Sequence, residues 1–212
     1  MVLTLKILVT LQKRRFVGYS AMQVALNEHL PRENKVVLLG TGLSLLGEEM
    51  MLDGYKLVDA IDYSEPCIKR MRNRQEKLEG LEKVGVNYQV MDVTQMEYKD
   101  ESIPSVLDKA TIDTMFNNED NLKSVHSMLA ETVRILEHDG LYVCLSYGDP
   151  DSRLEVLQDK RYDWKLITSS EIKKNKAVFY LYVLQKNNLK DASETAAVVD
   201  SWWWWKVHSK SV

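Results

Sequence analysis

The sequence predicts an α/β fold built on a doubly wound, mainly parallel sheet. Apolar runs alternate with helix-like segments from Val36 to Tyr147, which is the pattern of successive β-α-β units. A glycine-rich turn, Gly40-Thr41-Gly42, follows the first apolar run, and acids stand at the ends of three later runs. Because ligands of such sheets bind beyond the carboxyl ends of the strands, the pattern predicts a cofactor-binding fold.

The composition fits one soluble domain. The chain has 212 residues, of which 45% are hydrophobic and 28% charged, enough for a sizeable core. A net charge of -3 gives no reason to expect a nucleic-acid partner. The two cysteines favour thiols in a reducing, cytoplasmic compartment. The four histidines show no metal-ligand spacing, and no segment is long and apolar enough to span a membrane.

Residues 1–15 form a basic segment before the domain. Lys6 and the cluster from Lys13 to Arg15 precede the first acid, Glu28. A basic surface strand or helix is the preferred interpretation, with a mitochondrial presequence as the alternative. The expected localisation is therefore cytoplasmic, or mitochondrial if this segment is a leader.

The first half of the sheet is predicted from two apolar runs. A helix over residues 20–30 is ended by Pro31. Residues 36–39 are apolar throughout, as in a central parallel strand. A helix over residues 44–52 stops at an Asp-Gly pair, and residues 55–61 form the second strand.

The second half repeats this alternation. Ser64 and Pro66 mark a helix start, since serine caps helices and proline is tolerated in the first turn. Apolar residues then predict strands over 86–91, 103–107 and 141–147. Between the last two, apolar residues step by three or four, which predicts an amphipathic helix from Leu122 to Leu136.

The chain closes with two strands and a polar tail. Residues 162–168 and 177–185 read as strands joined by a short connection, which predicts an antiparallel hairpin. The domain is expected to cover residues 16–186. Residues 187–212 are expected to be a disordered tail, with a partner-binding or membrane-interface role for Trp202 to Trp205 as the alternative.

The predicted strand ends carry the candidate site. In this geometry Asp62 would accept hydrogen bonds from ribose hydroxyls. Asp92 would face an adenine amino group, and Val93 would offer an amide and an apolar contact to the ring. An NAD site would favour glycine at the position of Leu45. A large apolar residue there leaves less room for a pyrophosphate, so a cofactor without phosphates, S-adenosylmethionine, fits better.

A family resemblance is carried by three segments, which read VVLLGTGLSLLGEEMMLDGYKLVDAIDYSEPCIKRM, YQVMDVTQMEY and VLDKATIDTMF. They resemble the class I, seven-β-strand methyltransferases. Within these they are similar to the methyltransferase-like branch of elongation factor 1-alpha lysine methyltransferases and the methyltransferase linked to endothelin-converting enzyme 2. The resemblance implies a Rossmann-like sheet of order 3-2-1-4-5-7-6 with the last strand antiparallel.

The resemblance also implies site residues. The segments that bind S-adenosylmethionine in the family match the following positions: Gly40, Thr41, Gly42, Asp62, Tyr63, Asp92, Val93, Asp108 and Lys109. Asp108 is expected to position an acceptor amine. Departures are Thr41 and Leu43 where the family has Cys and Asn, and Ala110 where it has Gly.

The predicted function is methyl transfer from S-adenosylmethionine to a protein lysine. The alternatives are a non-catalytic methyltransferase-like scaffold and a small-molecule methyltransferase. Asp113 is expected to be an ordinary helix cap. Tyr147 is either a packed aromatic residue at a strand end or a substrate contact. The sequence predicts a protein substrate as partner and says nothing of the oligomeric state.

Overall fold

The computed structural model describes residues 18–78, 85–117, 121–174 and 177–188. They form a seven-stranded sheet in the order β3-β2-β1-β4-β5-β7-β6, which confirms the predicted topology. The predicted basic segment and the tail from residue 189 onward lie outside the described residues. The strands are β1 Lys35–Leu39, β2 Leu57–Asp62, β3 Asn87–Val90, β4 Ile103–Lys109, β5 Leu136–Ser146, β6 Trp164–Lys174 and β7 Ala177–Lys186.

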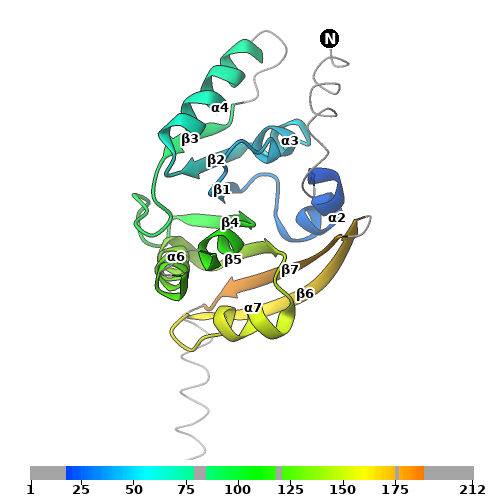
Figure 1. Cartoon of the computed structure of the whole chain (residues 1–212), viewed down its shortest axis with the longest axis vertical. Coiled ribbons are helices and arrows are strands. Elements are labelled where there is room, and N and C mark those ends of the chain that lie inside the picture. The colour runs from blue at the N-terminus through cyan, green and yellow to red at the C-terminus, as the bar shows by residue number, and fades with distance from the viewer. Residues whose placement is uncertain (1–17, 79–84, 118–120, 175–176, 189–212) are drawn as a thin grey trace, which may run out of the picture.

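Helices pack on both faces of this sheet (Figure 1). Successive residues of β1 point to opposite faces, so Val36 and Leu38 join one buried cluster while Val37 and Leu39 join the other. The first cluster takes residues from α2, α3 and α4, and the second from α5, α6 and α7. The helices are α2 Tyr19–His29, α3 Leu46–Leu52, α4 Glu65–Leu78, α5 Thr111–Phe116, α6 Asn121–Ile135 and α7 Pro150–Leu157.

Strand pairing places the candidate residues at one edge. Strands β1, β2, β3 and β4 pair in parallel, so their carboxyl ends meet. Leu39 of β1 is level with Asp108 of β4, and Asp62 of β2 is level with Val90 of β3. Within the described residues, no helix is long and apolar enough to cross a membrane.

The last part of the fold differs from the prediction in two ways. Helix α7 was not predicted, because its eight residues carry only a short apolar pattern. Strand β6 runs on to Lys174 rather than ending at residue 168. Its pairing with β7 continues to Ala177, whereas the pairing of β7 with β5 ends at Tyr180. The hairpin therefore projects past the end of β5.

Candidate active site

The glycine turn after β1 has the backbone shape that its sequence requires. Gly40 and Gly42 have φ values of +54° and +52°, in the left-handed region that favours glycine. A Cβ on Gly40 would lie 2.5 Å from Oγ1 of Thr111, whereas a Cβ on Gly42 would meet no described atom within 4 Å. Gly40 is therefore needed for packing, and Gly42 leaves its outer side open to a ligand.

Asp62 ties the glycine turn to the end of β2. One oxygen, Oδ2, accepts from the amide of Gly42 at 2.7 Å, and Oδ1 accepts from the amide of Ser64 at 2.8 Å. Asp62 is only 6% exposed. Each carboxylate oxygen has two lone pairs, so each retains one acceptor position for a ligand hydroxyl. The neighbouring Tyr63 is 82% exposed.

Asp92 and Val93 lie just after β3. Oδ1 of the exposed Asp92 accepts from the amide and the hydroxyl of Thr94, at 2.8 and 2.7 Å. Val93 is half-buried and packs against the second apolar cluster. The Asp92 carboxylate is therefore held beside the end of the sheet, with the backbone of Val93 next to it.

Asp108 is completely buried at the end of β4. Its carboxylate accepts from the amide of Thr111 at 2.7 Å, from the amide of Ile112 at 3.1 Å and from the hydroxyl of Tyr142 at 3.0 Å. Burial raises the pKa of this carboxyl to about 6, although the same hydrogen bonds act to lower it. Asp108 thus accepts from the first two amides of α5, and its lack of exposed surface favours positioning of that helix over direct contact with an amine.

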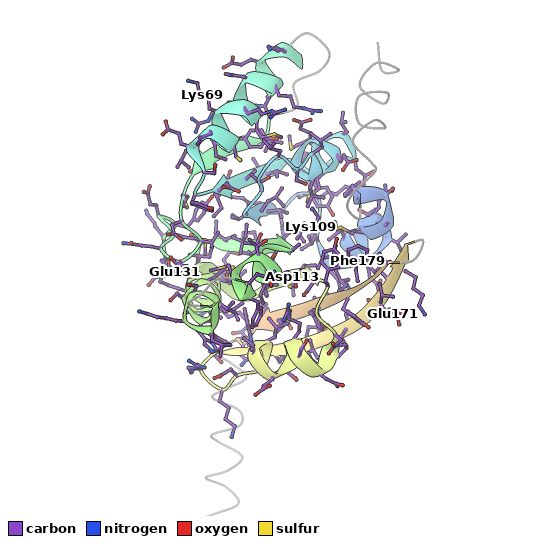
Figure 2. The ribbon with its side chains drawn as sticks, in the orientation of Figure 1. Lys69, Lys109, Asp113, Glu131, Glu171 and Phe179 are labelled. Atoms are coloured by element: carbon purple, nitrogen blue, oxygen red, sulfur yellow. The ribbon has the colours of Figure 1, made fainter. Side chains whose placement is uncertain are left out.

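Lys109 and Ala110 follow Asp108 where β4 ends. Figure 2 shows Lys109 beside the tip of β4, in the direction of α2 and α3. Burial lowers the pKa of the Lys109 amine, and the charges of Asp108 and Glu49 act against that shift. Ala110 has a φ of +65°, a left-handed conformation that costs an L-residue about 1–2 kcal/mol.

Asp113 is not a helix cap, and that expectation was wrong. It lies two residues after Thr111, the first residue of α5, so its side chain lies beyond the capping position. Its Oδ2 accepts from the amide of Tyr147 at 3.0 Å, and its Oδ1 pairs with Nη2 of Arg153 at 2.7 Å and accepts from the hydroxyl of Ser146. The N-cap residue is Ala110, and the first amides of α5 donate to Asp108.

Leu45, whose bulk is expected to leave less room for a pyrophosphate, is buried in the first apolar cluster, and that expectation stays a prediction. The choice between S-adenosylmethionine and NAD rests on the family of the chain, which a comparison with known proteins supplies.

A family model described as a methyltransferase domain matches residues 32–191. The chain belongs to this methyltransferase family. The family and the fold were both predicted from the sequence, and both are confirmed; S-adenosylmethionine as the cofactor agrees with them. Within the described residues, no group of three or more His, Cys, Asp or Glu side chains could hold a metal ion.

Two curated relatives carry names that mention lysine methylation. "EEF1A lysine methyltransferase 4" of Mus musculus is 25% identical over 189 residues, which cover 85% of this chain and 71% of the relative. "eEF1A lysine and N-terminal methyltransferase" of Mus musculus is 35% identical over 130 residues, or 60% of this chain. The match spans only 18% of that longer relative.

Solved structures share the fold of this methyltransferase at low sequence identity. An S-adenosylmethionine-dependent methyltransferase of Methanosarcina mazei superposes with a TM-score of 0.62 at 12% identity, covering 77% of this chain and 97% of its own. Magnesium protoporphyrin IX methyltransferase of Synechocystis, solved with bound S-adenosylmethionine, gives 0.59 at 12% identity, covering 79% and 76%. At this identity the likeness concerns the fold.

The structure gathers Gly40, Gly42, Asp62, Asp92 and Asp108 at the carboxyl edge of the sheet, as expected from the sequence. It adds Ser146 and Arg153, which the sequence reading missed. The sequence did contain a signal for α7, the helix that carries Arg153, because Asp149-Pro150 is a typical helix start. Nothing in the sequence pairs Arg153 with Asp113, which lies 40 residues earlier.

Proposed function

We propose that this chain transfers methyl groups from S-adenosylmethionine to lysine side chains of a protein, with elongation factor 1-alpha as the first candidate. Binding of the cofactor is supported above all by the Asp62 carboxylate, which accepts from the Gly42 amide and keeps acceptor positions for ligand hydroxyls. A protein lysine as the methyl acceptor is supported by the names of the curated relatives.

The cofactor roles follow from the strand ends. The backbone of the glycine turn lies at the end of β1 with Gly42 open on its outer side, and Asp62 accepts from ribose hydroxyls. Asp92 is an acceptor for an adenine amino group, with Tyr63 and Val93 beside the ring. These roles fit a nucleoside, because carboxylate oxygens accept from ribose hydroxyls and from an adenine amino group.

Lys109 suits the other end of the cofactor. Lys109 is a half-buried residue at the end of β4, one residue beyond the level of Leu39. A lysine beside the glycine turn matches the carboxylate of the methionine moiety, since opposite charges attract more strongly when partly removed from water.

The cofactor supplies an electrophilic methyl group, and the protein supplies orientation. Alignment of two reactants is worth about 7–11 kcal/mol of a barrier. An acceptor lysine must lose a proton before its nitrogen can attack. Asp108 is too deeply buried to meet that amine, so we assign it the indirect role of fixing α5 and the residues that follow β4.

The proposal is tested in two steps. Calorimetry with S-adenosylmethionine and with NAD is expected to show binding of the first only. Radiolabelled methyl transfer to purified elongation factor 1-alpha is then expected to label lysine, identified by mass spectrometry. Binding of S-adenosylmethionine without transfer to any lysate protein would favour a non-catalytic methyltransferase-like scaffold. Label confined to small molecules would favour a small-molecule methyltransferase.

A further inference from the structure

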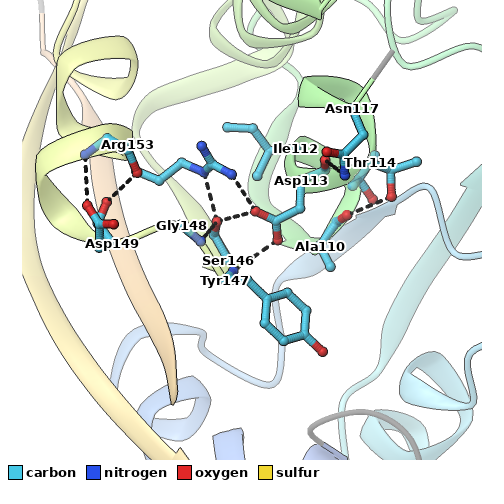
Figure 3. A network of polar contacts seen from close by, with 12 residues as sticks. Ala110, Ile112, Asp113, Thr114, Asn117, Ser146, Tyr147, Gly148, Asp149 and Arg153 are labelled. Carbon is cyan, nitrogen blue, oxygen red and sulfur yellow. Dashed lines mark hydrogen bonds and ion pairs between the residues drawn. The ribbon is translucent and has the colours of Figure 1, made fainter. Parts of the chain in front are cut away.

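A buried polar network joins three elements at the carboxyl edge of β5. Figure 3 shows Asp113 of α5 facing Ser146 at the end of β5 and Arg153 of α7. Nε of Arg153 donates to Oγ of Ser146 at 2.9 Å while its Nη2 pairs with Asp113 at 2.7 Å. Ser146 is fully buried, and the side chains of Arg153 and Asp113 are 12% and 13% exposed.

The environment of Arg153 makes this a built arrangement rather than a surface ion pair. The guanidinium lies 4.1 Å from the ring centre of Phe116, a cation–π contact that fixes its plane. Removing one partner of a largely buried pair leaves the other charge unpaired, which is strongly unfavourable. The network is therefore expected to hold α5, β5 and α7 in one geometry.

What the network holds is the backbone after β5. The amide of Tyr147 donates to Asp113 at 3.0 Å, and the amide of Gly148 donates to Oγ of Ser146 at 2.9 Å. On the other side, the hydroxyl of Tyr182 donates to the carbonyl of Gly148 at 2.7 Å. Both residues that follow β5 are thus tied down through their main chain.

This leaves the ring of Tyr147 in a defined position. The residue is 45% exposed, and Figure 3 shows its ring pointing away from Asp113 and Arg153. The ring meets Phe179, on the part of β7 that extends past β5, at 4.5 Å between ring centres. A large aromatic surface is therefore presented at the sheet edge by a backbone that cannot easily move.

The order of the strands places this surface beside the cofactor residues. Those residues end β1, β2, β3 and β4, and β5 is the next strand after β4. A reactant that approaches the cofactor from the β5 side passes Tyr147. Because Asp113 pairs with Arg153, the guanidinium charge is compensated and does not repel a cationic amine.

We propose that Tyr147 is a wall of the acceptor site, and that Asp113 is the positioning residue that sets it. This inference rests on the proposed function. The acceptor is an amine at the end of an alkyl chain, whose methylenes pack on the aromatic ring while the nitrogen extends beyond it. In the reaction the nitrogen lone pair bonds to the methyl carbon, the carbon–sulfur bond breaks with its electrons staying on sulfur, and the amine proton leaves to solvent.

The experiment separates acceptor binding from cofactor binding. Tyr147→Ala and Asp113→Asn are each expected to raise KM for elongation factor 1-alpha about tenfold, with the Kd for S-adenosylmethionine unchanged within about twofold. Tyr147→Phe is expected to behave like the wild type, because the ring surface acts rather than the hydroxyl. Asp151→Asn, an exposed acid on α7, is the matched control.

A second readout does not need activity. Asp113→Asn is expected to speed hydrogen exchange of the Tyr147 amide about tenfold, because that amide loses a charged acceptor. If Asp113→Asn does not fold, Ser146→Ala takes its place, with the Gly148 amide as the probe.

The outcomes are distinct. An unchanged acceptor KM in Tyr147→Ala would show that the Tyr147 ring does not line the acceptor site. Weaker binding of S-adenosylmethionine by this variant would show that Tyr147 contacts the cofactor instead. Unchanged exchange at Tyr147 overturns the role of Asp113. If the wild type methylates no amine at all, the proposed function fails and the acceptor wall with it, while the exchange measurement still decides whether Asp113 positions Tyr147.

Discussion

At the scale of single residues, Asp62 links the two halves of the cofactor site. Its carboxylate is the acceptor for two backbone amides and, in the proposed function, for ribose hydroxyls. We expect Asp62→Ala to raise the Kd for S-adenosylmethionine about 10- to 100-fold, because buried hydroxyls and the Gly42 amide lose an acceptor. Calorimetry measures this, with Asp151→Ala as control. Wild-type affinity would show that the ribose lies elsewhere.

Ala110 is a second residue with a local consequence. It adopts φ +65° before α5, where the related methyltransferase segments have glycine. We expect Ala110→Gly to stabilise the fold by about 0.5–1 kcal/mol, since relief of the left-handed conformation outweighs the added freedom of the unfolded chain. Denaturant unfolding measures the change.

The matched control for this substitution is Ala130→Gly, on the exposed side of α6. There the same change is expected to destabilise by about 1 kcal/mol, because glycine is a poor helix former. A loss of stability in both variants would contradict the argument from backbone strain.

At the scale of elements, α7 shows how a short helix is specified. Asp149 accepts from the amide of Ser152 at 3.0 Å, and Pro150 is the first helical residue. We expect Asp149→Ala to speed hydrogen exchange in the first turn of α7, because an N-cap oxygen is lost. Glu155→Ala, at an exposed position of α7, should leave that turn unchanged. Equal effects in both variants would show that the cap does not hold the helix.

The elements also show what the sequence could predict. The run at β1 is apolar on both faces, and the run at β2 is apolar except for Asp59 and the terminal Asp62, so the sequence could predict their place in a parallel sheet. The sequence could also predict that the acids after the strands lie close together, because parallel strands have their carboxyl ends at one edge of the sheet. Asp113 was misjudged as a cap because its partners, Ser146 and Arg153, lie 33 and 40 residues later, and only the packing of α5 against β5 and α7 brings them together.

At the scale of the whole molecule, Asp108 couples stability to pH. Its pKa is raised from 3.8 to about 6 by burial. Well below pH 3.8 the carboxyl is protonated in both the folded and the unfolded state, and its contribution to stability is complete. As the pH rises toward 6, the unfolded chain releases the proton while the folded chain retains it, so stability falls. A shift of this size corresponds to about 3 kcal/mol.

We therefore expect the free energy of unfolding of the wild type, relative to Asp108→Asn, to fall by up to about 3 kcal/mol between pH 4 and pH 7. The variant keeps one acceptor for the Thr111 amide but cannot ionise, so taking the difference cancels the titration of all other groups. Urea unfolding of both proteins across this range measures it. A difference that stays constant with pH, or that rises, would mean that Asp108 is ionised in the folded protein at little cost, and its burial would then not govern the acid stability of the fold.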